Sequence, residues 1–315
     1  MRKLLVICGP TATGKTTLAL SIAKTLAGEI ISADSRQVYK GTNIITGKDI
    51  PPEATFHKNK LGGYYQTKYT KIWGLDMIDI GEEYSISQYS KFAQKLINYL
   101  RKKGILPILV GGSGLYVKSV VDNLSLVNVP RNKKLRTKLA ALSTLQLQKK
   151  LLLLNPNKFS SLNSSDIQNR LRLYRAIEIS LYQVKHKSKQ ADLPLYDSLL
   201  IGLTASKKII SNKIKSRVLN RFTSGQKEAR YIINNSNKSK QALSAIGYPS
   251  WKQFLEGKLS KPQFLSVWHK QELKYAKRQM TWFKKDKRIH WIKNQKETEK
   301  LVKEFLVKEF PKTLK

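Results

Sequence analysis

Little in this sequence would cross-link the chain covalently or place it in a membrane. Its 315 residues include a single cysteine, Cys8, so neither an internal disulfide nor a thiolate zinc cluster can form. The first apolar run, Leu4–Cys8, is too short for the hydrophobic region of a signal peptide, and no stretch approaches the length of a membrane span. The four histidines lack metal-ligand spacing. We therefore expect a cytoplasmic protein without membrane association or zinc.

Acidic residues are also scarce. The chain has 21 Asp and Glu against 59 Lys and Arg, a formal net charge of +38. A surplus of this size predicts a polyanionic partner, although charge alone does not separate RNA from DNA or a membrane surface. A generally basic proteome, or charge that merely solvates helix faces, is the alternative. Hydrophobic residues make up 41% of the chain, enough for one large domain or two ordinary ones.

The apolar pattern of the first third of the chain alternates strands with helices. Leu4–Cys8, Glu29–Ala33 and Leu106–Val110 are short apolar runs typical of buried strands. Helical spacing occurs in Thr16–Leu26 and again in Tyr89–Leu100. Such alternation predicts an α/β fold with a parallel sheet covered by helices.

A different pattern begins at Leu124. From there to Leu200 the apolar spacing is almost wholly helical, and 14 Lys and Arg stand against 4 Asp and Glu. We predict a basic helical insertion domain over residues 124–199, suited to the polyanionic partner that the charge surplus predicts.

The strand pattern returns after this insertion. The apolar run Leu199–Leu203 predicts a strand of the same sheet, and Lys207–Ile233 a long helix. The chain from Lys238 onward has a helical, basic pattern. The catalytic core would therefore be discontinuous, formed by residues 1–123 and 200–315.

The turn after the first predicted strand carries the strongest local motif. It matches G-x-x-x-x-G-K-[ST] and lies between a strand and a helix, as a phosphate-binding loop requires. Backbone N–H groups and the positive end of the helix would surround a di- or triphosphate, with Lys15 adding a charge and Thr16 a hydroxyl ligand for Mg²⁺. The fold expected is P-loop NTPase-like. The predicted phosphate-binding residues are Gly9, Pro10, Thr11, Ala12, Thr13, Gly14, Lys15 and Thr16.

This loop alone does not choose between an NTPase, a kinase and a transferase. The strand Leu106–Val110 ends in Gly-Gly-Ser-Gly, not in an acid that would hold Mg²⁺ or a catalytic water, which argues against an ATPase. Asp34, after the second strand, is the other candidate acid. It would serve as a metal-side carboxylate, as a general base, or as a helix N-cap beside Ser35.

Further blocks of sequence occur in a fixed order along nearly the whole chain. Together with the P-loop they make the chain resemble the tRNA dimethylallyltransferase family, also called tRNA isopentenyltransferase. No single motif has the specificity of this series. The blocks are Asp34-Ser35-Arg36-Gln37-Val38-Tyr39, Gly111-Gly112-Ser113-Gly114-Leu115-Tyr116, Arg172 with Arg175-Ala176-Ile177-Glu178, Ile246-Gly247-Tyr248, and Lys277-Arg278-Gln279-Met280-Thr281-Trp282.

The chain also departs from this family. Three departures remove no functional group: Ser113 replaces Thr, Gly47 replaces Ala, and Pro249-Ser250 replaces the residues that usually follow Gly-Tyr. The others fall in the helix that keeps the family's Arg217 and Gly225: Lys213 stands where Arg is usual, Gln226 where Leu is, and the acidic residue is out of register at Glu228.

The resemblance implies a prenyl transfer to RNA. The family joins the exocyclic N6 amine of the adenosine 3′ of the anticodon to C1 of dimethylallyl diphosphate, and pyrophosphate leaves. A weakly nucleophilic aromatic amine would benefit from a carboxylate that accepts its proton, which favours Asp34. Donors aimed at the leaving pyrophosphate would contribute more, and Lys15, Thr16 and Arg217 with Mg²⁺ suit that role. The catalytic residues we predict are Thr16, Asp34 and Arg217.

RNA recognition would depend on shape and on a base turned out of its stack, because side chains cannot enter the deep groove of A-form RNA. Arg172 and Arg175 suit phosphate contact by their chemistry alone, the alternative being a solvated helix face. Trp282 and Trp291 could stack on bases, but aromatic residues at helical spacing are more often core. The resemblance implies RNA contacts by Asp34, Ser35, Arg36, Gln37, Ser113, Arg136, Leu171, Arg172, Leu173, Tyr174, Arg175, Ala245, Ile246, Gly247 and Tyr248.

Three other functions fit parts of the pattern. An adenylate prenyltransferase would use the same P-loop and carboxylate on free AMP, ADP or ATP, but would not need a basic insertion. A P-loop small-molecule kinase would leave the sequence blocks after Gly111 without a role. A non-catalytic RNA-binding protein would not need to keep Thr16, Asp34 and Arg217. We therefore expect a monomeric tRNA prenyltransferase that uses dimethylallyl diphosphate and Mg²⁺.

Overall fold

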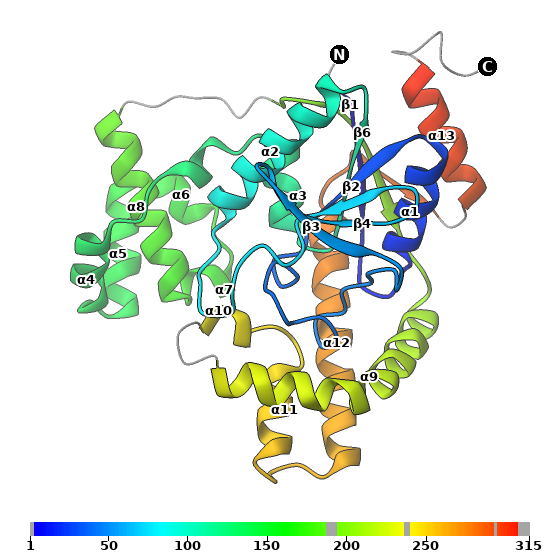
Figure 1. Cartoon of the computed structure of the whole chain (residues 1–315). Coiled ribbons are helices and arrows are strands. Elements are labelled where there is room, and N and C mark those ends of the chain that lie inside the picture. Colours follow the sequence, from blue (N-terminus) through cyan, green and yellow to red (C-terminus); the bar gives the residue numbers. More distant parts are fainter. Residues whose placement is uncertain (1–2, 187–193, 236–239, 293–294, 308–315) are drawn as a thin grey trace. The chain divides into compact units, whose positions relative to one another are not determined.

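The structure, a computed structural model, describes residues 3–186, 194–235, 240–292 and 295–307 (Figure 1). Within these ranges one sheet of eight strands is covered by helices. The strands are β1 (Lys3–Cys8), β2 (Gly28–Ser32), β3 (Thr55–Asn59), β4 (Gly62–Gln66), β5 (Lys71–Trp73), β6 (Leu106–Gly111), β7 (Asp197–Leu203) and β8 (Ile289–Ile292). The helices are α1 (Lys15–Thr25), α2 (Ile86–Lys102), α3 (Gly114–Val121), the 3₁₀ turn η1 (Ser125–Asn128), α4 (Lys133–Ala140), α5 (Thr144–Leu154), α6 (Pro156–Ser160), α7 (Ser164–Ile167), α8 (Arg170–His186), α9 (Lys207–Asn235), α10 (Lys240–Leu243), α11 (Tyr248–Leu255), α12 (Lys261–Phe283) and α13 (Gln295–Val307).

The strand order is β3-β4-β5-β2-β6-β1-β7-β8. From β5 to β8 all neighbours are parallel, and β1 lies between β6 and β7, with Leu5 opposite Ile108 on one side and Leu199 on the other. This confirms the parallel core and the return of the chain to the sheet through β7. The strands β3 and β4 pair antiparallel at one edge, so the sheet is mixed. The apolar pattern could not predict this hairpin, because every residue of β3 is exposed.

Alternation along the central strands builds a core on each face of the sheet, because successive side chains of a strand point to opposite faces. On one face Leu4, Val6 and Cys8 pack with residues of α2 and α3. On the other face Leu5 and Ile7 pack with residues of α1 and α13. Burial raises the pKa of the Cys8 thiol to about 12, so this cysteine is part of the core rather than a reactive group.

The C-terminal part of the chain is not entirely helical. The helices α9, α11 and α12 form a third core cluster around Trp251 and Trp268, as the helical spacing indicated. The strand β8 follows α12 and pairs in parallel with β7, which corrects the prediction of a wholly helical segment after Lys238. Four residues are too few to show a strand period, and the burial of Ile289 and Ile292 depends on the neighbouring strand.

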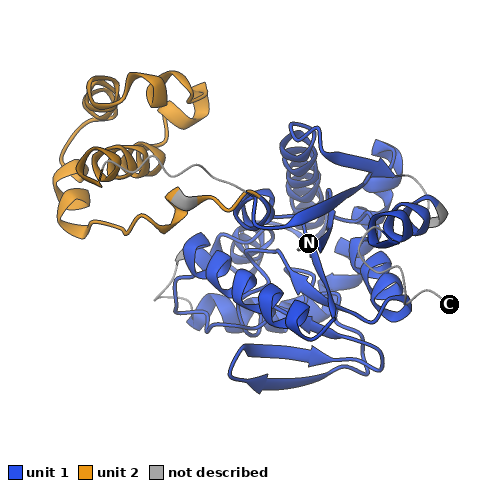
Figure 2. Ribbon diagram, turned by 90° about the horizontal axis from the view of Figure 1, so that it is seen from above, with its two compact units in different colours: residues 1–121, 194–315 blue, residues 122–193 orange. Residues whose placement is uncertain are grey.

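The chain divides into two compact units (Figure 2). Unit 1 comprises Met1–Val121 and Pro194–Lys315, and unit 2 comprises Asp122–Leu193. The predicted insertion, residues 124–199, thus extends a few residues too far, since β7 begins at Asp197. Unit 2 has its own apolar cluster, which includes Leu139, Leu147, Leu151, Leu173 and Ile177.

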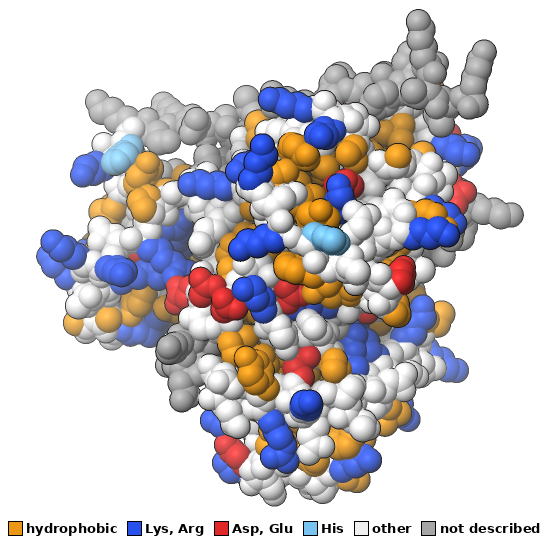
Figure 3. Space-filling view, in the orientation of Figure 1, with side chains coloured by type: hydrophobic (Ala, Val, Ile, Leu, Met, Phe, Trp, Pro, Cys, Tyr) orange, Lys and Arg blue, Asp and Glu red, His pale blue; other side chains and the backbone are white. Residues whose placement is uncertain are grey.

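Basic side chains are spread over the visible surface, and acidic ones are fewer there (Figure 3). None of the helices within the described ranges has both the length and the apolar character needed to span a bilayer. Nor do His, Cys, Asp and Glu gather there in threes or more as a metal site would require.

Candidate functional site

The predicted phosphate-binding loop, called the P-loop below, connects the carboxyl end of β1 to the first turn of α1. Gly14, directly before the helix, has a left-handed backbone (φ 88°). The carbonyl oxygen of Pro10 accepts hydrogen bonds from the Lys15 ammonium at 2.7 Å and from the Thr13 hydroxyl at 2.9 Å. The start of the loop and the start of the helix are therefore tied together, with Lys15 at the positive end of the helix, where anions bind.

A cavity of about 500 Å³ opens beside this loop, within unit 1. Its volume falls in the usual range for sites that bind small molecules. The cavity brings together segments that are far apart in sequence: the P-loop, the turn after β2, the helices α9 and α12, and the residues just before α11. The predicted site residues that line it are Thr11, Ala12, Gly14, Lys15, Thr16, Asp34, Ser35, Arg36, Gln37, Arg217, Ala245 and Ile246.

Lys15 and Asp34 lie within electrostatic range of each other in this cavity. Burial lowers the pKa of Lys15 to about 8, an effect that the Asp34 carboxylate opposes and the Arg217 charge reinforces. Burial raises the pKa of Asp34, against the opposing effects of the Arg36 backbone N–H and the Lys15 charge. The site therefore holds a carboxylate more basic than a free aspartate next to a cation whose charge an anionic ligand would stabilise.

Asp34 also shapes the turn that follows it. Its Oδ1 accepts the backbone N–H of Arg36 at 2.9 Å, and the next four residues form a turn, not a helix. The backbone N–H of Ser35 donates to Ser113 Oγ at 3.0 Å, and the Arg36 guanidinium donates to the carbonyl oxygen of Gln241 at 3.0 Å. Asp34 is thus a turn cap rather than a helix N-cap, and it lines the cavity at the same time.

The helix α12 links the P-loop to the rest of the site. The amide oxygen of Gln279 accepts the backbone N–H of Thr11 at 2.8 Å, and its nitrogen donates to the carbonyl oxygen of Gly112 at 3.0 Å. A side chain on Gly112 would come within 2.1 Å of this amide, which explains the glycine. Arg217 donates to Thr11 Oγ1 and to the Glu272 carboxylate, both at 2.8 Å. The P-loop is therefore held from α9 and α12 together.

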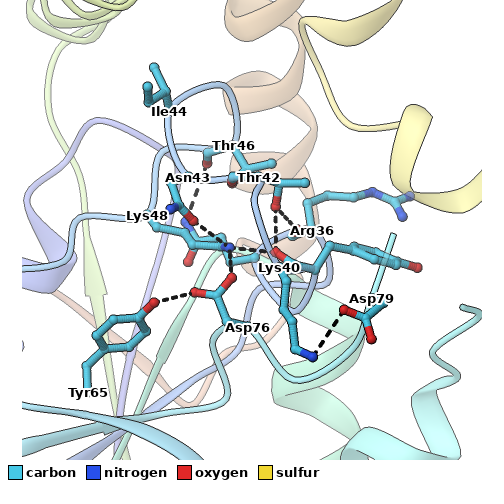
Figure 4. Close-up of polar contacts among 12 residues, drawn as sticks. Arg36, Lys40, Thr42, Asn43, Ile44, Thr46, Lys48, Tyr65, Asp76 and Asp79 are labelled. Carbon is cyan, nitrogen blue, oxygen red and sulfur yellow. Dashed lines mark hydrogen bonds and ion pairs between the residues drawn. The ribbon is translucent and has the colours of Figure 1, made fainter. Parts of the chain in front are cut away.

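A buried lysine fixes the loop between residues 42 and 49 (Figure 4). The Lys48 ammonium donates to the carbonyl oxygen of Tyr39 at 2.6 Å, to Asn43 Oδ1 at 2.9 Å and to Asp76 Oδ1 at 2.5 Å. The Tyr65 hydroxyl donates to the other oxygen of Asp76 at 2.7 Å. Because the side chain of Lys48 is fully buried, these partners replace water around its charge, and the loop has one well-defined position.

Glu228 holds the same loop from α9. Its carboxylate accepts the backbone N–H groups of Ile44 at 2.7 Å and Ile45 at 3.0 Å, and the Tyr248 hydroxyl at 3.0 Å. The acidic residue that the sequence placed out of register thus caps a loop at the edge of the cavity.

The predicted arginines of the insertion have internal partners. Arg136 donates from Nε and Nη2 to the two oxygens of Glu178 at 2.7 and 2.8 Å. Arg175 donates to the carbonyl oxygens of Val129 at 2.8 Å and Leu126 at 3.1 Å. These contacts join α4, α8 and η1 around a carboxylate that is 1% exposed. Both arginines therefore stabilise unit 2. The sequence indicated RNA contact or a solvent-exposed helix face, but not this internal role.

The remaining predicted RNA contacts differ in exposure. Arg172 is 58% exposed and pairs with Asp166, and Leu171 is 67% exposed. Leu173 and Tyr174 are buried in the core of unit 2, so their side chains are part of that core. Ala245, Gly247 and Tyr248 are likewise buried, whereas Ile246 is partly exposed. RNA contact by any of these residues stays a prediction.

Two protein families match this chain. The IPP transferase family matches residues 37–286 and the isopentenyl transferase family residues 2–60. The tRNA dimethylallyltransferase 2 of Treponema denticola is 34% identical over 91% of this chain and 94% of its own. The chain belongs to the tRNA dimethylallyltransferase family. Family membership confirms the resemblance seen in the sequence blocks.

Other members of the tRNA dimethylallyltransferase family are similar to this chain over nearly its whole length. That of Carboxydothermus hydrogenoformans is 32% identical over 98% of this chain and 99% of its own. The full-length tRNA isopentenylpyrophosphate transferase of Bacillus halodurans superposes with a TM-score of 0.70 at 28% identity, covering 98% of each chain. A eukaryotic dimethylallyltransferase shares the fold, with a TM-score of 0.77 at 20% identity, over 98% of this chain and 78% of its own.

Several residues that line this cavity were absent from the sequence prediction. Gln279 and Arg278 belong to a recognised sequence block but had no assigned role, and both line the cavity with Glu272 and Tyr275. Position within the block was the signal that could have indicated Gln279. Glu272 gave no signal, because its partner Arg217 is 55 residues away in the sequence.

Proposed function

We propose that the chain transfers a dimethylallyl group from dimethylallyl diphosphate to the N6 amine of the adenosine 3′ of the anticodon in tRNA, releasing pyrophosphate. The observation that carries this proposal is a single cavity lined by a diphosphate-binding loop and by a basic carboxylate, Asp34. The family relatives are named for this activity. A kinase would not need the tRNA-family blocks that line the same cavity.

The leaving group is stabilised by the P-loop. As the C1–O bond breaks, negative charge accumulates on the diphosphate oxygens, and preorganised donors there lower the barrier. The backbone amides of the loop, the Lys15 ammonium and the Arg217 guanidinium are the donors available. Gln279 and Glu272 contribute indirectly, because their bonds to Thr11 and Arg217 hold the loop and the guanidinium in place.

Asp34 accepts the proton of the attacking amine. The new bond joins N6 to C1 while the C1–O bond breaks, pyrophosphate leaves, and one N6 proton passes to the carboxylate. A pKa raised by burial makes this carboxylate a better base. Its bond to the Arg36 N–H fixes the orientation of the carboxylate.

A divalent cation fits this site only as a partner of the diphosphate. Thr16, in the first turn of α1, offers a hydroxyl oxygen, and Mg²⁺ commonly binds through one or two protein oxygens together with substrate phosphates and water. Within the described ranges no cluster of carboxylates, histidines or cysteines could hold it alone. Bound there, Mg²⁺ would neutralise charge on the leaving pyrophosphate.

The basic insertion is the feature that favours tRNA over a free adenine nucleotide as acceptor. Its Lys and Arg surplus would neutralise phosphates of a folded RNA, whereas AMP would need only the cavity. Labelled dimethylallyl diphosphate incubated with the protein and either unmodified tRNA or AMP tests the proposal. We expect label in tRNA alone. Label in AMP alone would favour an adenylate prenyltransferase, and label in neither would refute prenyl transfer.

Substitution of Asp34 tests its role. Asp34→Asn keeps an oxygen that can accept the Arg36 N–H but loses the charge and the basicity. We expect a nearly unchanged melting temperature and a single-turnover rate with saturating tRNA lower by roughly 10²-fold or more. Asp34→Ala, which also loses the turn cap, should in addition be less stable. An Asn variant within about threefold of the parent would eliminate the general base.

A further inference from the structure

Three cations lie along one face of α9. Lys213, Arg217 and Arg221 are spaced four residues apart, which places them on the same side of a helix. All three line a hollow of about 530 Å³, together with Asp49. Lys213, Arg217 and Asp49 also line the P-loop cavity, so the hollow and the cavity are contiguous. A row of positive charge therefore leads outward from the P-loop.

The two guanidinium groups of this row, those of Arg217 and Arg221, have N–H donors that make no hydrogen bond within the described residues. Arg217 Nε is buried and makes no hydrogen bond within the described residues. The side chain of Arg221 is 15% exposed, and its ion pair is a loose one of 3.6 Å to an Asp49 carboxylate that is itself 63% exposed. In the described part of the chain no hydrogen bond supplements this pair. A charge so far removed from water, with so weak a partner, is costly unless an anion binds to it.

The position of Arg221 depends on Gly47. A Cβ atom on Gly47 would lie 2.4 to 2.7 Å from three atoms of the Arg221 guanidinium. The loop cannot move away easily, since Glu228 and Lys48 hold it from two sides, and Gln37 donates to the Gly47 carbonyl oxygen at 2.9 Å. The guanidinium consequently lies against the backbone of a residue that lines the P-loop cavity.

Of the cations in this row, Arg221 has the weakest internal partner relative to its burial. We propose that Arg221 adds a phosphate-binding subsite beside Arg217 at the mouth of the P-loop cavity, where its guanidinium holds one phosphate of the diphosphate. The proposal rests on the proposed function in that the P-loop takes the rest of the same ligand. Arginine presents a planar set of donors that matches phosphate oxygens. Asp49 lines both the hollow and the cavity and is only a weak partner of Arg221, and Gly47 leaves the room that the guanidinium needs.

The test measures binding of inorganic pyrophosphate to the full-length protein by calorimetry. Arg221→Gln should weaken this binding roughly tenfold, as expected for a lost charge-assisted hydrogen bond of about 1.4 kcal/mol, and should raise KM for dimethylallyl diphosphate similarly. Arg230→Gln, an exposed arginine on the same helix, is the matched control and should bind like the parent. The subsite would be refuted if Arg221→Gln bound pyrophosphate within twofold of the parent. It would also be refuted if the variant lost affinity for tRNA and not for pyrophosphate.

A second variant moves the guanidinium without removing it. Gly47→Ala should weaken pyrophosphate binding in the parent but have little further effect in the Arg221→Gln background. The backbone strain of an alanine in the left-handed region is the same in both backgrounds, so it cancels when the two effects are compared. Equal effects in both backgrounds would contradict the contact. If the parent itself bound no pyrophosphate, the subsite and the P-loop function would both be refuted, whereas binding that Lys15→Met abolishes and Arg221→Gln leaves intact would refute the subsite alone.

Discussion

The cavity of unit 1 and the centre of unit 2 are each built around arginines beside a buried glutamate, but the arginines are satisfied to different degrees. In unit 2, Arg136 makes a two-pronged contact with Glu178, and Arg175 is surrounded by carbonyl oxygens. Among the residues of unit 1 that the structure describes, Arg217 binds Glu272 but its Nε makes no hydrogen bond, and Arg221 forms one loose ion pair. Satisfied arginines join elements together, and partly satisfied ones are suited to an anionic ligand.

This contrast distinguishes arginines that stabilise the fold from arginines that are suited to bind a ligand. The sequence presents all four arginines in the same way, as basic residues on helices. Only their partners distinguish them. Substitutions in unit 2 should therefore change the free energy of unfolding, and substitutions in the cavity should change ligand affinity and rate.

The largest effect on stability should come from Glu178→Gln. The variant leaves Arg136 and Arg175 without their carboxylate, and breaking a buried pair of this kind costs about 3–5 kcal/mol. Urea unfolding should show the loss. Glu256→Gln, which removes an exposed carboxylate paired with Lys258, should cause no measurable change. Equal stability of both variants would contradict the structural role assigned to the insertion arginines.

Glu178 should also make the stability of the fold depend on pH in the acid range. Although burial opposes it, the bonds from Arg136 and the Asn132 N–H hold the pKa of Glu178 below its usual 4.5. A lowered folded-state pKa stabilises the fold above pH 4.5, and this contribution is lost as pH falls through the folded-state value. The difference in unfolding free energy between the parent and Glu178→Gln should therefore shrink below pH 4.5.

In the cavity, Arg217→Lys should impair catalysis more than stability. A single ammonium keeps the charge but cannot span Thr11 Oγ1 and the Glu272 carboxylate as the guanidinium does. We expect kcat/KM for dimethylallyl diphosphate to fall about tenfold or more. Arg136→Lys is the matched change in unit 2 and should leave kcat/KM close to the parent value while lowering the melting temperature. If Arg136→Lys lowered kcat/KM and Arg217→Lys did not, the distinction between the two regions would be wrong.

Binding of pyrophosphate should weaken in mild alkali. Because burial lowers the pKa of Lys15 to about 8, this lysine is charged below that pH and loses its charge as pH rises through it. One linked proton predicts a Kd that rises by about tenfold per pH unit well above 8. Lys15→Arg, whose guanidinium stays charged, corrects for titration of the ligand and should show a flatter profile. Parallel profiles would show that Lys15 does not govern the pH dependence.

The smallest effect should come from an exposed arginine of unit 2. Arg172→Gln removes a cation that is 58% exposed and should weaken tRNA binding about threefold at moderate salt, reducing the slope of log K against log salt by roughly 0.7–0.9. Lys303→Gln on α13 removes an exposed charge outside the predicted RNA surface and is the control. An unchanged slope for Arg172→Gln would remove this residue from the RNA contacts.

Local pattern was sufficient for much of the fold. Continuous apolar runs marked β1, β2, β6 and β7 because these strands are buried on both faces. The hairpin of β3 and β4 and the short strand β8 escaped prediction, since the hairpin is exposed and β8 depends on pairing with β7. The structure divides the chain at residues 121 and 194, and the sequence placed its predicted boundaries at residues 124 and 199 from a change in composition and in secondary-structure pattern.

By itself the sequence determined the parallel core, the phosphate-binding loop, the candidate base Asp34 and the family, because each depends on neighbouring residues or on an ordered series of blocks. Tertiary structure alone decided what each charged side chain does. Gln279 contacts a residue 268 positions away, Arg217 one 206 positions away, and Glu228 one 184 positions away. Whether an arginine binds a ligand or stabilises a core depends on which carboxylates and carbonyl groups surround it, and packing over such distances leaves no local pattern in the sequence.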